Sequence, residues 1–199
     1  MVRSAAAALL ALSLLAGPAF AQGDISSDAT LAPAGSYKLD KAHASVTMKV
    51  SHLGFSYYTL RFDGVDAGYS YDPAHPEAAK VEATIDANSV DTGDAAFNRQ
   101  IASEVFDSGK YPQIRFVSTA VRTTPEGRGT VIGDLTFHGV TKPVTLDVIF
   151  NGAGAEKGKP ERMGFSATAQ IRRADFGATK YAPLVGDNVS VVMEVEFTR

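Results

Sequence analysis

The sequence contains no cysteine. This absence excludes disulfide bonds, thiolate metal sites, iron–sulfur clusters and cysteine nucleophiles. The chain has 199 residues, of which 45% are hydrophobic and 21% are charged, as is usual for a globular protein. The burial of apolar side chains must therefore stabilise the fold without covalent cross-links.

Positive charge is also scarce. Lysine and arginine together number 19, aspartate and glutamate number 22, and the formal net charge is −3. The basic residues form no cluster in the sequence. This balance argues against nucleic acid and against an anionic membrane surface as partners.

Motifs for catalysis and for metal binding are missing as well. The four histidines, His43, His52, His75 and His138, form no H-x-H or H-E-x-x-H pair and have no carboxylate at ligand spacing. The chain has no G-x-S-x-G elbow, no G-x-G-x-x-G motif and no phosphate-binding loop. The sequence therefore predicts no enzyme, no catalytic residue and no metal site.

Two of these histidines have a local interpretation. His52 follows an apolar strand face, which leaves three interpretations open: a buried histidine hydrogen-bonded at a barrel rim, a donor to the polar head of a ligand, or a metal ligand. His43 follows Asp40 in a turn, where we expect a structural hydrogen bond.

A few charged or glycine positions also need an interpretation. Arg172, Arg173 and Asp175, with Lys180 nearby, predict a solvated ion-pair network, with a charged rim patch as the alternative. Gly133 lies inside a strand pattern, where glycine marks a bulge or a close backbone contact more often than a catalytic loop.

The N-terminus has the three parts of a secretory signal peptide. Met1–Arg3 is short and positive, Ala5–Ala16 is apolar, and Ala19–Ala21 is an A-x-A cleavage site. The apolar run is too short for a membrane-spanning helix of ~20 residues, although a retained N-terminal anchor is the alternative. The sequence thus predicts a signal peptide over 1–21, export to the periplasm, a flexible leader over 22–35 and one domain over 36–199.

Alternating apolar and polar residues run through most of this domain. In the clearest example Val46, Met48 and Val50 face one way and the residues between them face the other. About eight such segments with short turns predict an all-β fold, either a sandwich or an up-and-down barrel. The small residues on inward faces, which would leave room inside a barrel of ~8 strands, are Ala83, Ala167 and Ala169.

One hairpin is defined more closely by its turn residues. We expect strands over Thr130–Phe137 and Val144–Phe150, joined around Gly139–Lys142, with Pro143 at the first strand position. An exposed loop is expected over Asn151–Glu161, which is rich in glycine, lysine and glutamate.

One segment has helical rather than strand spacing. Asp91 and Thr92 are suitable N-cap residues, and Phe97 and Ile101 then fall at i and i+4 on one apolar face. Gly109 ends the helical segment. A single short helix in a strand-patterned chain is expected to cover one region of a barrel.

These motifs, in this order and spacing, resemble the YceI-like family of exported, polyisoprenoid-binding bacterial proteins. The resemblance covers Ser36–Arg199. The residues that carry it are Leu39-Asp40 with His43, His52-Leu53-Gly54, Ser89–Gly93, Arg99, Val105-Phe106-Asp107, Lys110-Tyr111-Pro112, Ile114, Phe116, Ser118, Gly133–Val144, Asp175-Phe176-Gly177 and Val185-Gly186-Asp187.

The resemblance implies a lipocalin-like antiparallel β-barrel of about eight strands with one short helical insertion. It further implies an elongated apolar tunnel that holds an isoprenoid lipid, either a polyprenyl chain or a quinone tail. This lipid would be a bound ligand rather than a catalytic cofactor. The resemblance also implies a possible homodimer. It implies no established catalysis.

The expected lining combines inward strand residues with apolar residues of the helical segment. Each of these side chains would equally suit the core of a filled barrel. The predicted ligand-binding residues are Val46, Met48, Val50, His52, Val81, Ile85, Phe97, Ile101, Phe106, Phe116, Phe165 and Met193.

Three functions remain open from the sequence. The first is a periplasmic carrier for an isoprenoid lipid, linked to quinone transport or envelope stress. The second is a non-catalytic stress or partner protein whose barrel is filled. The third is an enzyme acting on an isoprenoid lipid, with His52, Asp134 or His138 as acid or base.

Overall fold

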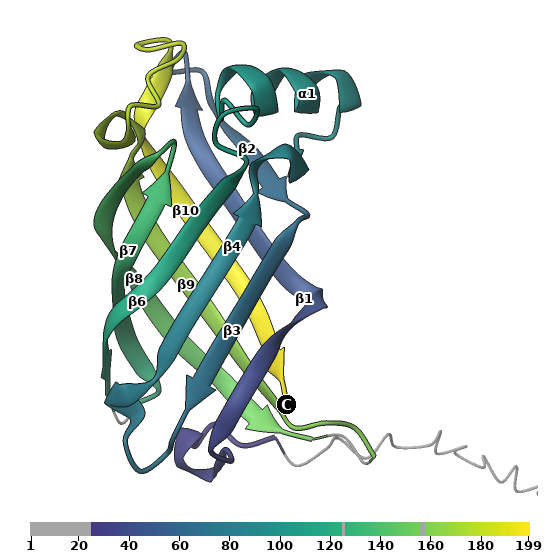
Figure 1. The fold of residues 1–199 in the computed structure, drawn as a ribbon, viewed down its shortest axis with the longest axis vertical. Coiled ribbons are helices and arrows are strands. Elements are labelled where there is room, and N and C mark those ends of the chain that lie inside the picture. Colours follow the sequence, from purple (N-terminus) through teal and green to yellow (C-terminus); the bar gives the residue numbers. More distant parts are fainter. Residues whose placement is uncertain (1–24, 125, 156–157) are drawn as a thin grey trace, which may run out of the picture.

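The computed structural model describes residues 25–124, 126–155 and 158–199 (Figure 1). The expected signal peptide lies outside these residues. No helix in the described part of the chain is long and apolar enough to cross a membrane.

Eight antiparallel strands close into a barrel, as expected from the sequence, and β1 pairs with both β3 and β10. Neighbouring strands around the barrel follow the order β1, β3, β4, β6, β7, β8, β9, β10. Their bounds are β1 Gly35–His52, β3 Val65–Tyr71, β4 Lys80–Asp86, β6 Gln113–Thr123, β7 Arg128–Phe137, β8 Val140–Gly154, β9 Arg162–Arg172 and β10 Val185–Thr198.

Two short strands extend the sheet at one end. The first part of β1 pairs with β3, and its last part, from Val46 to His52, pairs with β2 (Ser56–Phe62). β5 (Val90–Asp91) then pairs with the end of β2. β1 is therefore long enough to contribute to the whole height of the barrel (Figure 1).

The one α-helix among the described residues, α1 (Ala95–Glu104), lies at one end of the barrel (Figure 1). Its N-cap is Asp94, whose carboxylate accepts a hydrogen bond of 2.7 Å from the Phe97 backbone N–H. The predicted N-cap residues Asp91 and Thr92 were therefore wrong in position. They bind the Asn98 side chain instead, with the Asn98 amide donating to Asp91 at 3.0 Å.

The helix also ends earlier than Gly109. The backbone N–H groups of Val105 and Phe106 both donate to the carbonyl of Ile101, which closes the last turn. The Phe106 side chain then enters the barrel and is only 3% exposed. Burial of this ring, rather than a helix-breaking residue, sets the end of the helix.

The predicted β7–β8 hairpin is confirmed, but its turn is shorter than expected. His138 and Gly139 both have positive φ angles, 51° and 76°, as a two-residue type I′ turn requires. β8 therefore starts at Val140, and Pro143 lies within the strand opposite Asp134 rather than at its first position. β8 also continues to Gly154, into the segment expected to be an exposed loop.

The segment expected to be a flexible leader is structured from Ile25 onward. Ser26 and Ala153 exchange two backbone hydrogen bonds of 2.8 and 2.9 Å, which extends the pairing of β8. The short 3₁₀ helix Ala29–Leu31 follows, and the Tyr71 hydroxyl donates to the carbonyl of Ala29 at 2.9 Å. This segment lies at the end of the barrel opposite α1 (Figure 1).

Three further 3₁₀ turns connect the strands. They are Pro76–Ala78 between β3 and β4, Ala87–Ser89 before β5, and Arg173–Phe176 between β9 and β10. The last of these leads into the segment that returns the chain to β10.

Gly133 illustrates how tightly neighbouring strands pack. A Cβ atom there would lie 2.4 Å from Cζ of Phe116 and 2.5 Å from the backbone carbonyl oxygen of Val117. The close contact expected from the sequence is confirmed. A Cβ at Gly68, in β3, would meet no atom within 4 Å.

We expect Gly133→Ala to lower the free energy of unfolding by about 1–3 kcal/mol, because the backbone oxygen of Val117 cannot move aside cheaply. Urea-induced unfolding of the purified protein measures the change. Gly68→Ala is the matched control and should change stability by less than about 0.5 kcal/mol. Equal stability of both variants would contradict the packing argument.

Candidate ligand-binding site

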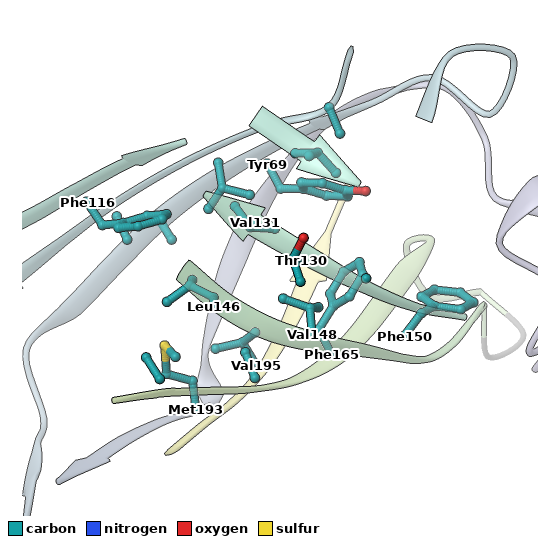
Figure 2. A pocket seen from close by; sticks show the side chains of 18 of the residues that line it. Tyr69, Phe116, Thr130, Val131, Leu146, Val148, Phe150, Phe165, Met193 and Val195 are labelled. Atoms are coloured by element: carbon teal, nitrogen blue, oxygen red, sulfur yellow. The ribbon is translucent and has the colours of Figure 1, made fainter. Parts of the chain in front are cut away.

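The interior of the barrel is hollow. A cavity of about 970 Å³ runs inside it and is lined by apolar side chains from all eight barrel strands. Figure 2 shows part of this wall, including Phe116, Phe165 and Met193. Ala83, Ala167 and Ala169 line it as well, so the small inward residues do leave space. This volume is at the upper end of the ~300–1,000 Å³ of typical small-molecule sites.

A second cavity of about 390 Å³ lies between the barrel and α1. The two cavities share four wall residues, Met48, Phe106, Phe137 and Ile171, so they adjoin across this apolar constriction. Phe106 and Phe137 contact each other there, with ring centroids 6.0 Å apart. The site is thus elongated and has two compartments.

Both cavities reach the protein surface, at opposite ends of the barrel. Exposed residues of the segment after Ile25, Asp28 and Thr30 among them, line the first cavity. Exposed residues at the α1 end, including His52 and Leu53, line the second.

All twelve predicted ligand-binding residues lie on the walls of these cavities. Their contact with a ligand stays a prediction. Val46, Met48, Val81, Ile85, Phe106, Phe116, Phe165 and Met193 line the first cavity, and Met48, Val50, His52, Phe97, Ile101 and Phe106 line the second.

Tyr69 is a wall residue that the sequence analysis did not select. Its ring stacks on Tyr71 and packs edge-on against Phe165, with centroid distances of 5.8 and 5.4 Å. Burial raises the pKa of the Tyr69 phenol, so this side chain stays neutral and can offer a hydroxyl group inside the apolar cavity. The alternation of Tyr69 and Tyr71 in β3 was the signal for an inward pair.

Arg173 corrects a prediction from the sequence. It is only 5% exposed and is not part of a solvated ion-pair network. Its guanidinium donates to four backbone carbonyls, those of Ala178, Lys180, Val185 and Gly186, at 2.6–2.8 Å. Burial lowers the pKa of this guanidinium. Arg173 therefore fixes the segment between β9 and β10, which forms part of the wall of the second cavity.

The neighbouring Arg172 behaves as the sequence predicted. It is exposed and its Nε lies 2.9 Å from the Asp187 carboxylate. Such a solvated pair contributes little to stability. The two adjacent arginines thus have opposite roles.

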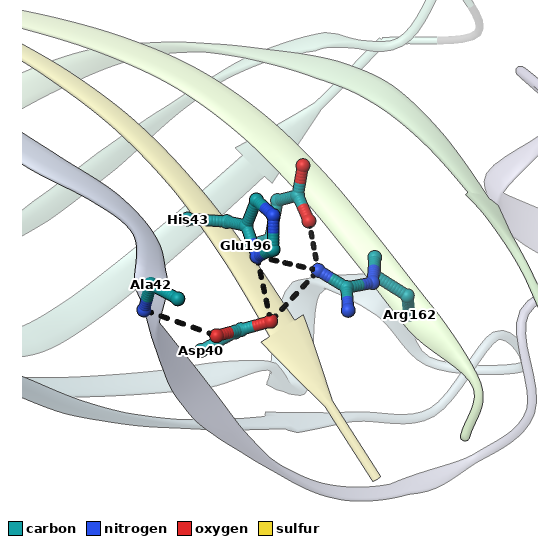
Figure 3. A network of polar contacts seen from close by, with 5 residues as sticks. All are labelled: Asp40, Ala42, His43, Arg162 and Glu196. Atoms are coloured by element: carbon teal, nitrogen blue, oxygen red, sulfur yellow. Dashed lines mark hydrogen bonds and ion pairs between the residues drawn. The ribbon is translucent and has the colours of Figure 1, made fainter. Parts of the chain in front are cut away.

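A second polar network joins β1, β9 and β10 (Figure 3). The Arg162 guanidinium lies 2.9 Å from the Asp40 carboxylate and also contacts Glu196. His43 binds Asp40 at 2.9 Å, which confirms its expected structural role. Asp40, His43 and Glu196 are close enough to hold a cation, but the guanidinium already lies between the two carboxylates. We assign no metal to this network.

The structure does not support a shared catalytic site for the three acid–base candidates. Of the three, only His52 lines either of these two cavities, at the surface end of the second. Asp134 is exposed and lies opposite Pro143. The His138 ring packs against Tyr111, with centroids 4.7 Å apart, in the β7–β8 turn.

The sequence also matches a known domain. Residues 37–197 match the YceI-like domain. The chain belongs to the YceI-like family. A UPF0312 protein of Pseudomonas putida (strain GB-1) is 44% identical over 162 residues, which cover 80% of this chain and 84% of that protein.

Solved structures share the fold of this YceI-like protein. BcnA of Burkholderia cenocepacia superposes with a TM-score of 0.71 at 28% identity, covering 79% of this chain and 98% of BcnA. The Campylobacter jejuni YceI protein gives 0.67 at 29%, covering 75% and 89%. A polyisoprenoid binding domain from Saccharophagus degradans gives 0.61 at 19%, covering 81% and 97%, which is a likeness of fold alone.

Replacement of Arg173 tests its role in fixing the cavity wall. We expect Arg173→Met to lower the free energy of unfolding by about 3 kcal/mol, because it leaves buried carbonyl groups without donors. Thermal and urea unfolding measure the loss. Arg172→Met, the matched control, should cost less than about 1 kcal/mol. A loss no larger than that of the control would contradict the assigned role.

The Asp40 network predicts a pH dependence. His43 is the main group that lowers the pKa of Asp40 below its usual value of 3.8, and the Ala42 N–H and Arg162 add to it. The ionised Asp40 carboxylate therefore stabilises the fold in full at pH values above the usual, unfolded pKa. This contribution is lost as the pH falls below that value and through the lower pKa of the folded state. We expect Asp40→Asn to flatten the acid limb of stability between about pH 5 and pH 2, measured by urea unfolding. An acid limb as steep as that of the wild type would contradict the assignment.

Proposed function

We propose that this protein is a periplasmic carrier that holds an isoprenoid lipid, a polyprenyl chain or a quinone tail, inside its barrel. The observation that carries the proposal is the hollow, apolar interior of about 970 Å³ that adjoins a second apolar compartment. A tail without hydrogen-bonding groups gains ~0.8 kcal/mol per buried CH₂ and needs few polar partners. The wall offers such surroundings, with isolated hydroxyls such as that of Tyr69.

Family membership supports the ligand class. A protein of the same fold in Saccharophagus degradans is described as a polyisoprenoid binding domain. The periplasmic location rests on the signal peptide expected over residues 1–21. In this proposal the protein binds its ligand and catalyses no reaction.

The two alternative functions fit less well. A partner protein with a filled barrel requires an interior without space, whereas the interior here is hollow. An enzyme on the same lipid would depend on His52, the one acid–base candidate on a cavity wall. A His52→Ala variant that still binds the lipid but has lost a turnover measured for the wild type would favour the enzyme hypothesis.

The direct test is native mass spectrometry, with organic extraction, of protein purified from the periplasm of its own host. We expect one bound species per barrel, with masses spaced by isoprene units. Protein that is empty and also fails to take up added polyprenols or quinones would overturn the proposal.

A variant that fills the cavity gives a second test. In Ala167→Phe the new ring enters the first cavity, so we expect lipid occupancy to fall about tenfold or more while stability falls by no more than about 1–3 kcal/mol. Thr168→Phe, at the adjacent outward position on β9, is the matched control and should bind normally. Native mass spectrometry and urea unfolding measure the two effects. Full lipid occupancy in Ala167→Phe would show that the ligand does not lie in this cavity.

A further inference from the structure

Exposed apolar side chains gather at the α1 end of the barrel. The turn between β1 and β2, the start of β2 and the segment between β9 and β10 carry them, and we call this set the apolar rim. Phe55 is 88% exposed, Tyr57 69% and Leu184 57%. The apolar rim consists of Leu53, Phe55, Tyr57, Tyr181 and Leu184.

The two segments are held together and held rigid. The Leu53 backbone N–H donates to the carbonyl of Leu184 at 2.8 Å. Leu53 and Gly54 have positive φ angles of 53° and 76°, which form the tight turn that carries Phe55 outward. Arg173 fixes the second segment through its four carbonyl contacts. These hydrogen bonds therefore fix the apolar rim in a conformation that leaves its side chains exposed to solvent.

The apolar rim is continuous with the second cavity. Leu53, Tyr181 and Leu184 are exposed to solvent and also line this cavity. An apolar molecule could pass from an apolar phase outside the barrel to the first cavity along a mainly apolar surface, whose polar members include His52, Gln100 and Lys180. Contiguous exposed apolar surface of this kind marks an interaction site.

We propose that the apolar rim docks on the surface of a phospholipid bilayer and that the isoprenoid lipid passes there between the bilayer and the barrel. This proposal rests on the proposed function, because such a tail is insoluble in water and resides in membranes. Tyrosine suits the boundary between lipid head groups and acyl chains, since its ring is apolar and its hydroxyl is polar.

The charges around the apolar rim fit docking by apolar insertion. The ammonium groups of Lys49 and Lys180 lie 6.0 and 5.2 Å from the ring centroids of Tyr57 and Tyr181. Glu104 lies 3.7 Å from the Lys180 ammonium and also binds the Tyr181 hydroxyl. Glu104 therefore balances the charge of Lys180, so the positive charge near the rim is small. This agrees with the net negative charge of the chain, which argues against binding to an anionic surface. Docking should depend only weakly on salt and on anionic lipid.

A second copy of the chain is a weaker candidate for the occupant. Stable interfaces use about 20–30 residues on each side, whereas the apolar rim has five, carried by a turn, the start of β2 and a loop. Shallow insertion into a bilayer needs only a few apolar and aromatic side chains. The bilayer is therefore the occupant that the size of the rim favours.

Flotation with vesicles of phosphatidylethanolamine and phosphatidylcholine, with and without phosphatidylglycerol, tests the docking. The test variant combines Phe55→Ser and Tyr57→Ser, because neither residue lines a cavity. We expect the bound fraction to fall roughly tenfold. The matched control combines Leu31→Ser and Ile149→Ser, which are exposed apolar positions away from the rim, and should float like the wild type.

A second measurement separates the two proposals. Quenching of tyrosine fluorescence by a soluble, short-chain quinone reports ligand binding without a membrane. Wild-type protein that binds this quinone but does not float would overturn the docking alone, as would equal flotation of the rim variant. Protein that floats through the apolar rim but takes up neither the quinone nor, by native mass spectrometry, an added polyprenol would overturn the proposed function and the passage of lipid at the rim, but not the docking. A third outcome is wild-type protein that does not float but forms a dimer, while the rim variant is monomeric. This outcome would overturn the docking and assign the apolar rim to contact with a second copy of the chain.

Discussion

Closure of the sheet by β1 against β10 is the constraint on which the rest of the structure depends. Because a closed sheet has one interior, every second side chain of eight strands must share that space. The volume of those side chains then decides whether the barrel is solid or hollow. Alanines at inward positions of β4 and β9 leave the space that the large inward rings of Phe116 and Phe165 do not fill.

The same constraint explains how much the sequence could predict. Strand alternation has a period of two, so the inward face of each strand can be deduced from local sequence. The nine strand residues selected in this way all lie on the cavity walls, and so do Phe97, Ile101 and Phe106, which were selected from the helical segment. The division into two cavities could not be predicted, because it arises where Met48 of β1 meets Phe106 and Phe137 from distant parts of the chain.

Three of the errors share a physical origin, which is contact with other parts of the chain that local sequence rules do not consider. Arg173 looks like a surface charge because its partners are carbonyl groups, which every residue has and which no sequence pattern marks. The helix ends where Phe106 turns into the barrel, not at the glycine that local rules select. The segment expected to be a flexible leader joins the sheet from Ile25 onward because Ser26 pairs with Ala153.

The two ends of the barrel differ in a way that bears on where a ligand would enter and leave. At one end, a segment that includes Ala29 lies against the barrel and is tied to Tyr71 and Ala153. At the other, the second cavity opens among exposed apolar side chains that no part of the described chain covers. An insoluble ligand that enters at the apolar rim meets exposed apolar side chains at the opening itself, with polar residues such as Gln100 and Lys180 beside them, whereas a path past Asp28 and Thr30 enters between polar side chains. The asymmetry therefore favours exchange at the α1 end.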